Sequence, residues 1–389
     1  MELLSFTFLI IDAGIIAMLV AGIVYSWKLI AIAIPLFFLY PFIYEPVLKL
    51  LYYLLDKMVK DKKNFNEGYK ELESKNFMVY HPIYNIKVCG IEKQHPFDTN
   101  KYERVLKFLD QYAPNIDWNN YHQTRDPRYS FLYPRIGLLH LILLNYSLYL
   151  SKIAELPVLF VPNVILRLLA LRRFYYATQG SLDAADIAMK RGLAVNLGGG
   201  YHHAHADGGS GFCFVNDIGL VIQHLRVKFT QKINKILIID LDAHQGNGHE
   251  RDKLKMPNED IYIFDAYNDG IFPQDHFAKT AINKSILLNS SYDDLKYLTE
   301  LETALNEIEK EFPADFIIYN AGTDILIGDP LGGLSITEDG IIKRDELVFH
   351  YAHRHKVPIL MLLSGGYQKS NAPIIAKSLI NINRKFNLA

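Results

Sequence analysis

Cysteine is nearly absent from this sequence of 389 residues, which contains only Cys89 and Cys213. Two cysteines are too few for a disulfide framework or for a cysteine-rich zinc module. Any metal site in this chain must therefore be built from histidine and carboxylate side chains.

Net charge is nearly absent as well. The chain has 41 Lys and Arg residues against 42 Asp and Glu residues, which gives a formal net charge of -1. Nucleic-acid-binding proteins usually carry an excess of positive charge, so we expect no direct binding to nucleic acid. The sequence also shows no internal repeat and no low-complexity tract. Its length allows one large domain with an appendage, or two domains.

Charged residues are missing from most of the N-terminal region. Residues 3–27 carry no charge except Asp12, and residues 29–44 are apolar again, with two prolines. A membrane-spanning helix needs roughly 20 apolar residues. The sequence therefore predicts a membrane anchor over residues 1–55, with one or two helices; a buried helical hairpin is the alternative interpretation.

Lysines follow the apolar region at positions 57, 60, 62 and 63. Positive charge beside a membrane segment tends to stay on the cytoplasmic side, so we expect a membrane-anchored protein whose remainder is cytoplasmic. Residues 56–76 are polar and predict a juxtamembrane linker, and residues 77–389 predict a folded domain.

Short apolar runs alternate with helical-period segments in this domain. The runs predict strands at 77–80, 194–197, 236–239, 261–264, 316–319 and 359–363. The other segments predict helices at 102–112, 181–191, 216–228, 293–310 and 341–353. The apolar segments 138–150 and 157–171 are shorter than a span and predict core helices or a membrane-leaning surface. This alternation is typical of an α/β fold, here a doubly wound, mostly parallel sheet with helices on both faces.

Three polar side chains follow the strand at 236–239. Asp240, Asp242 and His244 are spaced two residues apart and would share one face of an extended chain. Buried carboxylates need partners, and a divalent cation is one candidate; a solvated acidic loop with an incidental histidine is the alternative. A sharp turn is expected at Gly246–Gly248.

Polar loops follow three other predicted strands. They contain GGGYHH at 198–203, NAGTD at 320–324 and SGGY at 364–367. Ligands of open α/β sheets bind outside the carboxyl ends of the strands, so we expect these loops to meet near Asp242. The three glycines at 198–200 have neither the spacing of a dinucleotide loop nor a P-loop lysine.

Together these motifs resemble the zinc-dependent histone deacetylases, which have the arginase/deacetylase fold. The matching segments are GGGYHH at 198–203, GFCFVND at 211–217, IDLDAHQGNGHERD at 239–252, NAGTDILIGDPLGGLSI at 320–336 and SGGYQ at 364–368. In detail the chain is similar to class IV, through DAHQGNGHERD, KRDELVF at 343–349, YHPIYNI at 80–86 and HPFD at 95–98. The resemblance implies that residues 77–389 form a deacetylase-like catalytic domain.

The resemblance implies a zinc site made by Asp242, His244 and Asp324. Three protein ligands leave one position open for water and for the substrate carbonyl, as catalytic zinc requires. It also implies a monovalent cation, K⁺, near the backbone of residues 240–244. The cofactors expected are therefore Zn²⁺ and a structural K⁺.

The resemblance further implies that His202 and His203 handle protons, with His203 as the general base. Asp240 would stand behind His202 and fix its tautomer, whereas Asn247 stands behind His203 where some classes have an aspartate. An asparagine would raise the pKa of that histidine less.

The remaining implied site residues surround the substrate. The hydroxyl of Tyr367 would polarise the scissile carbonyl and donate to the oxyanion. A tunnel for the acyl-lysine would be formed by Gly211, Phe212, Phe272 and Gly366.

Two segments depart from the family pattern. The region around His140 reads LLHLILLNYSLYL, where the family usually has a more polar His-Thr pair. The rim loop reads AELPVL at 154–159, without the aspartate that grips the substrate backbone in some classes, and Glu155 is a candidate replacement.

The leading hypothesis is therefore hydrolysis of N-acyl-lysine in an acylated protein or peptide, by deacetylation or long-chain deacylation. Class IV relatives are associated with long-chain fatty acyl substrates. Alternatives are a deacetylase of acetylpolyamines or other small amides, a binuclear arginase-like hydrolase, and a non-catalytic, membrane-tethered acyl-lysine binding protein. The arginase-like alternative needs more carboxylate ligands than these loops offer.

Overall fold

The computed structural model describes residues 76–86, 96–127, 136–156, 166–256 and 260–388. The predicted membrane anchor, residues 1–55, lies outside these ranges. Among the helices that are described, none combines the length and the apolar character needed to cross a bilayer.

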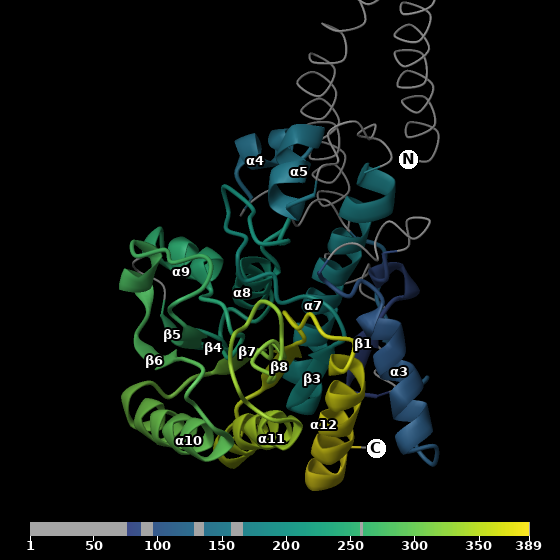
Figure 1. Ribbon diagram of the computed structural model, residues 1–389, viewed down its shortest axis with the longest axis vertical. Coiled ribbons are helices and arrows are strands. Elements are labelled where there is room, and N and C mark those ends of the chain that lie inside the picture. Colours follow the sequence, from purple (N-terminus) through teal and green to yellow (C-terminus); the bar gives the residue numbers. More distant parts are fainter. Residues whose placement is uncertain (1–75, 87–95, 128–135, 157–165, 257–259, 389) are drawn as a thin grey trace, which may run out of the picture.

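Within the described ranges, a single sheet of eight strands forms the centre of the fold, and every neighbouring pair is parallel. The strand order is β2-β1-β3-β8-β7-β4-β5-β6 (Figure 1). The strands are β1 (Met78–Tyr80), β2 (His122–Gln123), β3 (Leu193–Asn196), β4 (Ile236–Asp240), β5 (Ile261–Asn268), β6 (Lys284–Leu288), β7 (Phe316–Asn320) and β8 (Ile359–Leu362). The predicted parallel α/β sheet is confirmed, and all of its described pairs are parallel.

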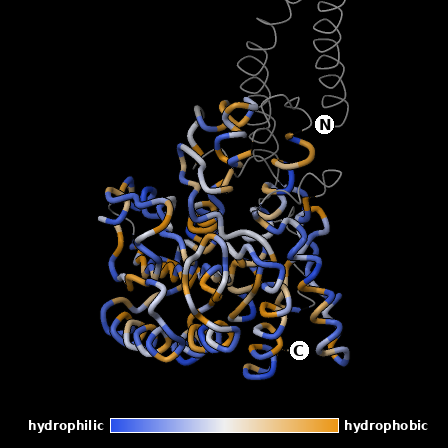
Figure 2. The backbone as a smooth tube through the Cα atoms, viewed as in Figure 1, coloured by the Kyte–Doolittle hydropathy of each residue, from blue (hydrophilic) through white to orange (hydrophobic). Residues whose placement is uncertain are grey.

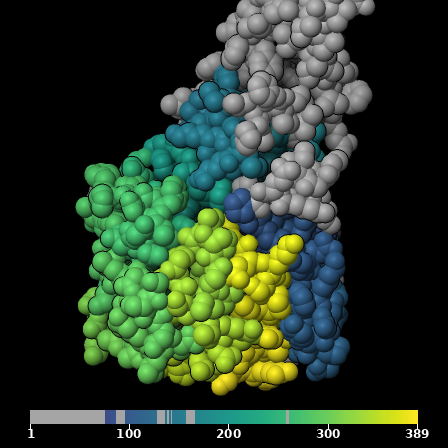
Figure 3. All heavy atoms as spheres, in the orientation of Figure 1, coloured from purple at the N-terminus to yellow at the C-terminus, as the bar shows by residue number. Residues whose placement is uncertain are grey.

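Helices pack on both faces of this sheet. They are α3 (Lys101–Tyr112), α4 (Leu138–Leu143), α5 (Ser147–Ala154), α7 (Arg172–Arg191), α8 (Asp217–Lys228), α9 (Asn247–Leu254), α10 (Asp294–Glu311), α11 (Glu338–His355) and α12 (Asn371–Phe386). The described residues also form the short helices η1 (Pro82–Tyr84), the π-helical η4 (Arg167–Leu171) and η5 (Ala278–Ala281). In the space-filling view, α10, α11, α12 and α3 form one continuous layer across the lower part of the molecule (Figure 3).

Strand β4 shows how the two faces are filled. Its residues are fully buried, and Leu237 and Ile239 pack with α10, α11 and α12, whereas Ile236 and Ile238 pack with α7 and α8. A strand buried on both faces has no polar side, which explains its unbroken apolar sequence. Helices α10 and α11 instead alternate between polar and apolar residues (Figure 2), as expected for helices with one buried face.

Several element boundaries differ from the sequence prediction. Helix α7 begins at Arg172, because η4 continues into it without a break. The apolar segment 138–150 is divided into α4 and α5. Residues 246–248 do not form a simple turn: Gly246 is the N-cap of α9, a polar helix without an apolar stripe that sequence periodicity could detect.

Candidate active site

The four central strands of the sheet, β3, β8, β7 and β4, are neighbours and end at the same edge. Their carboxyl ends open into the four polar loops identified in the sequence. The tandem histidines follow β3, Asp242 and His244 follow β4, Asp324 follows β7 and Tyr367 follows β8. The strand order therefore brings together residues that are up to 165 positions apart in the sequence (202 to 367).

Asp242, His244 and Asp324 converge on one buried point. The Nδ1 atom of His244 lies 3.1 Å from Asp242 Oδ1 and 2.9 Å from Asp324 Oδ2. The outer oxygens are held by the backbone, since the Gly365 N–H donates to Asp242 at 2.9 Å and the Ala243 N–H donates to Asp324 at 2.8 Å. A Cβ at position 365 would lie 2.5 Å from Asp242 Oδ2, so only glycine allows this approach.

The electrostatics of this group suit a cation. Burial and the charge of Asp242 raise the pKa of Asp324 to about 7. Burial alone would lower the pKa of His244, but the two carboxylates raise it to about 10. Burial would likewise raise the pKa of Asp242, yet His202 and His244 hold it well below its usual range. Two carboxylates whose charges repel each other beside an imidazole form a donor set that a divalent cation would stabilise.

The tandem histidines lie beside this group with rings 4.1 Å apart. His202 Nδ1 contacts Asp240 Oδ2 at 2.9 Å, and His203 Nδ1 contacts Asn247 Oδ1 at 2.9 Å. Both expected partners are therefore in place.

Their environments shift the two imidazole pKa values in opposite directions. Burial would lower the pKa of His202, but the charges of Asp240 and Asp242 raise it to about 9. For His203, burial and the neighbouring His202 hold the pKa well below its usual range. Titratable pairs whose pKa values are pushed apart are typical of acid–base sites.

Tyr367 faces the same point. Its ring centroid lies 5.9 Å from that of His244 and 6.2 Å from that of Phe212. Burial and the charges of Asp324 and Asp242 raise the pKa of its phenol well above the usual value, so the hydroxyl keeps its proton.

Of the predicted tunnel residues, Gly211 and Phe212 line the cavity described next, whereas Phe272 and Gly366 do not. Gly211 has a φ of +50°, and a Cβ there would lie 2.4 Å from the His203 ring. Phe272 is 45% exposed, with its ring 5.0 Å from that of His203. Gly366 has a φ of +120° and packs against Thr323; its neighbours Gly365 and Tyr367, rather than Gly366 itself, line the cavity described next.

An apolar cavity of about 190 Å³ adjoins the histidines and Tyr367. Its far walls come from α5 and the following turn, from η4 and the start of α7, and from the segment before α3. The apolar lining residues are Ile86, Phe97, Tyr102, Leu150, Ala154, Leu156, Leu166, Leu169, Ala170, Leu171, Phe174, Phe212 and Phe214. The site therefore opens into a chamber much more apolar than the metal-ligand group beside it.

Some residues that shape the site had no sequence signal. Lys101 at the start of α3 is fully buried, and its Nζ donates to the carbonyl oxygens of Ser364 and Gly365. Asp329 accepts a hydrogen bond from the Tyr367 N–H at 2.9 Å. A lysine in the first turn of an amphipathic helix is normally solvent-exposed, so only the tertiary structure could identify Lys101.

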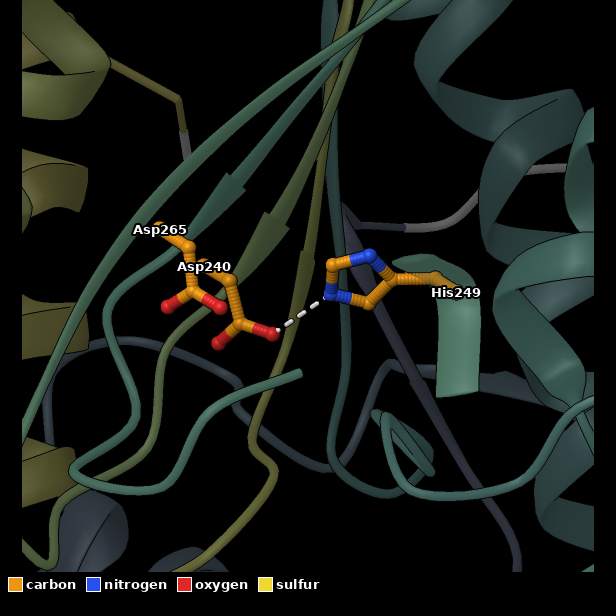
Figure 4. Close-up of side chains that lie close together, drawn as sticks. All are labelled: Asp240, His249 and Asp265. Carbon is orange, nitrogen blue, oxygen red and sulfur yellow. Dashed lines mark hydrogen bonds and ion pairs between the residues drawn. The ribbon is translucent and has the colours of Figure 1, made fainter. Parts of the chain in front are cut away.

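A second group of possible metal ligands lies behind His202. It consists of Asp240, His249 and Asp265 (Figure 4) and is one of two such groups among the described residues. Asp240 belongs to this second group, whereas Asp242 and His244 form the first group together with Asp324. The three residues after the strand therefore do not act as one set of ligands.

The two segments that depart from the family pattern take up defined positions. His140 contacts the Tyr149 hydroxyl at 2.8 Å and the Phe214 carbonyl oxygen at 3.0 Å, and so joins α4, α5 and the cavity wall. Glu155 is exposed in the turn that ends α5, two residues after Ile153, whose carbonyl accepts from the Phe212 N–H. Glu155 therefore lies near the tunnel residue Phe212.

Comparisons with known proteins agree with this geometry. Residues 162–382 match the family model described as histone deacetylase domain. Histone deacetylase 2 of Arabidopsis thaliana is 41% identical over 319 residues, which cover 80% of each chain. Histone deacetylase 8 of Xenopus laevis is 31% identical over 201 residues, covering 49% of this chain and 59% of that protein.

Two solved structures share the fold. The HDA15 HD domain superposes with a TM-score of 0.62 at 18% identity, covering 79% of this chain and 88% of the other. An HDAC homologue complexed with SAHA superposes with a TM-score of 0.59 at 19% identity, covering 80% and 84% of the two chains.

Proposed function

Because this chain belongs to the histone deacetylase family, we propose that it is a zinc-dependent amidohydrolase that removes acyl groups from lysine side chains of proteins or peptides. The observation that carries the proposal is the convergence, at one end of an apolar cavity, of three groups. They are the Asp242–His244–Asp324 group, two histidines with oppositely shifted pKa values, and a protonated Tyr367.

Asp242, His244 and Asp324 would hold the zinc. When bound by three protein ligands, zinc polarises a carbonyl and lowers the pKa of a bound water. The three side chains fit this task because their donor atoms already lie within 4.8 Å of one another and are buried from competing water.

His203 is suited to be the general base. The Asn247 Nδ2 atom donates to Asp275 Oδ2 at 3.4 Å, which orients the Asn247 oxygen toward His203 Nδ1. That nitrogen must therefore carry the proton, which leaves a lone pair on Nε2. With its pKa held well below the usual range, His203 is neutral and can accept a proton from the attacking water and then return it to the leaving amine.

His202 and Tyr367 would stabilise the charges that develop. The raised pKa keeps His202 protonated near neutral pH, so this ring contributes positive charge beside Asp242. His202 Nε2 lies 3.6 Å from Asp242 Oδ1. Tyr367 keeps its phenolic proton and would donate it in a hydrogen bond to the oxyanion of the tetrahedral intermediate.

Incubation with fluorogenic acetyl-lysine and myristoyl-lysine peptides, with and without a chelator, tests this function. We expect metal-dependent turnover of at least one peptide. If the metal-loaded protein released neither acyl group, the lysine-deacylase proposal would be wrong.

The apolar cavity favours a long acyl chain over acetyl. An acetyl methyl would leave most of the chamber between α5 and η4 unfilled, whereas each methylene buried there stabilises binding by up to about 0.8 kcal/mol. A series of acyl-lysine peptides should therefore show kcat/KM rising with chain length. Filling the chamber with Ala170→Phe should reverse that preference, whereas Leu168→Phe, at an exposed position of the same helix, should not.

Residues 1–55 would tether the catalytic domain to the cytoplasmic face of a membrane. The apolar sequence of residues 3–27 supports this tether. Two exposed leucines on elements that line the cavity also support it: Leu148 on α5 is 69% exposed and Leu168 on η4 is 51% exposed. Carbonate extraction should leave the full chain in the membrane pellet, and right-side-out vesicles should protect the catalytic domain from protease. Release by carbonate would contradict the tether.

The monovalent cation that the resemblance implies would lie near the backbone of residues 240–244, with Asp265, the strand partner of Asp240, and Glu250 beside it. These carboxyl groups are buried, and Asp265 Oδ1 and Glu250 Oε1 have no hydrogen-bond donor within the described structure. Burial and the charges of Asp240 and Glu250 raise the pKa of Asp265 well above its usual value, which a cation would counteract. The melting temperature should be higher in K⁺ than in N-methylglucamine; equal values would argue against the cation.

A further inference from the structure

We propose that His249 is a positioning residue for the proposed hydrolysis, and that it acts through Asp240 on His202. The inference rests on the proposed function, because it assumes that His202 takes part in the reaction. Figure 4 shows the arrangement: the His249 imidazole points toward Asp240, and Asp265 lies beside Asp240 on the neighbouring strand.

Asp240 connects the two histidines through a single oxygen. His202 Nδ1 lies 2.9 Å from Asp240 Oδ2, and His249 Nε2 lies 2.9 Å from the same atom. A carboxylate oxygen accepts hydrogen bonds, and one nitrogen of each ring lies within hydrogen-bond distance of this oxygen. Both imidazole nitrogens therefore donate to Asp240.

The other oxygen of Asp240 is also occupied. Oδ1 accepts from Asn320 Nδ2 at 2.9 Å and from the Asp242 N–H at 3.2 Å. A carboxylate has about four acceptor sites, and protein donors fill all four here. His249 therefore completes the set that fixes the orientation of Asp240, and Asp240 in turn fixes the ring of His202.

The first turn of α9 supports both tandem histidines at once. Asn247 holds the His203 ring, the Gly248 N–H donates to the His202 carbonyl oxygen at 2.8 Å, and His249 reaches Asp240. Gly246 makes this approach possible, because a Cβ there would lie 2.1 Å from His249 Nε2 and 2.5 Å from Asp240 Oδ2. This short polar helix thus aligns both histidines of the proposed reaction.

Loss of the His249 donor should weaken catalysis without weakening substrate or metal binding. Residues that orient catalytic or metal-bound groups typically change activity by about 10- to 100-fold when replaced. In His249→Leu we expect kcat to fall by about that factor, with KM within about twofold of wild type and zinc content unchanged. His249→Gln keeps an N–H donor with similar reach and should recover most of the rate, whereas the shorter His249→Asn should not.

A double-mutant cycle separates positioning from a general structural role. If His249 acts through Asp240 on His202, then adding His249→Leu to His202→Ala should reduce the residual rate no further. A second loss that multiplies the first would overturn the inference. So would a Gln variant no better than the Leu variant, or a Leu variant that loses zinc.

A spectroscopic readout keeps the test independent of the substrate. In the zinc-loaded full chain, the His202 Nδ1 proton bonded to Asp240 should give a downfield ¹H NMR signal that is identified by its absence in His202→Ala. We expect this signal to move or disappear in His249→Leu and to persist in His249→Gln. An unchanged signal in His249→Leu would refute the inference even if no acylated peptide were hydrolysed.

Discussion

Tyr367 and Asp242 lie within one site, but their loss should have different consequences. Tyr367 offers a protonated hydroxyl to the oxyanion and is not among the possible metal ligands, whereas Asp242 is one of them. Removing one oxyanion donor typically costs a factor of about 10² to 10³ in kcat. We therefore expect Tyr367→Phe to lose at least about 10²-fold in kcat with full zinc content, and Asp242→Ala to lose the zinc itself.

Steady-state kinetics and elemental analysis of the purified variants check both expectations. Tyr112→Phe, at an exposed tyrosine on α3, is the matched control and should behave like wild type. If Tyr367→Phe kept nearly the full rate, the role assigned to its hydroxyl would be incorrect.

At the scale of elements, α11 connects the strands that deliver the metal ligands. Arg344 is fully buried on this helix and donates to the carbonyl oxygens of Leu241, Ala321 and Gly322, at the ends of β4 and β7. It also pairs with Asp345 at 2.8 Å. One guanidinium group thus fixes the backbone next to Asp242 and Asp324.

Arg344→Met should therefore destabilise the fold and also loosen the metal site. Removing one partner of a buried ion pair typically costs about 3–5 kcal/mol, because the remaining charge is left unpaired. Chemical denaturation should show a loss of that order, and zinc affinity should fall, whereas Lys343→Met at the neighbouring exposed position should change neither. A stable Arg344→Met variant with normal zinc affinity would disprove this role.

At the scale of the whole molecule, the Asp242–His244–Asp324 group should make the stability of the chelated protein depend on pH. The pKa of Asp324 is about 7 in the fold against 3.8 ordinarily, so between these values the folded state keeps a proton that the unfolded chain releases. The pKa of His244 is likewise about 10 against 6.5. Both groups thus make the fold less stable as pH rises. Asp324 has this effect between about pH 4 and pH 7, and His244 has it between about pH 6.5 and pH 10.

Denaturation of the chelated protein should therefore give a lower free energy of unfolding at pH 8.5 than at pH 5.5. Asp324→Asn should remove the part of this decline that falls between pH 4 and 7. Zinc, which displaces these protons, should stabilise the protein more at pH 8.5 than at pH 5.5. A metal-free wild-type protein whose stability rises over this range would contradict the electrostatics of the site.

Much of the fold could be predicted because its cause is local. The six apolar runs predicted as strands all became strands, since a parallel strand covered on both faces must be apolar throughout. Strands β2 and β6 and helices α9 and α12 were not anticipated. Strand β2 has only two residues, β6 alternates buried and exposed residues over only five positions, and α9 is a polar helix, so these three elements have no strong hydrophobic period.

The sequence by itself determined which residue types stand at the ends of the strands, and the parallel α/β pattern implied that these ends share one edge. Only the tertiary structure decided the partners. In the folded chain Asp240 contacts His202 and His249 rather than joining Asp242 in one ligand group. Lys101 donates a hydrogen bond to the Gly365 carbonyl oxygen, in the loop that carries Tyr367. Those contacts join residues 9 to 264 positions apart. Their geometry depends on strand order and helix packing, which no periodicity within a single segment encodes.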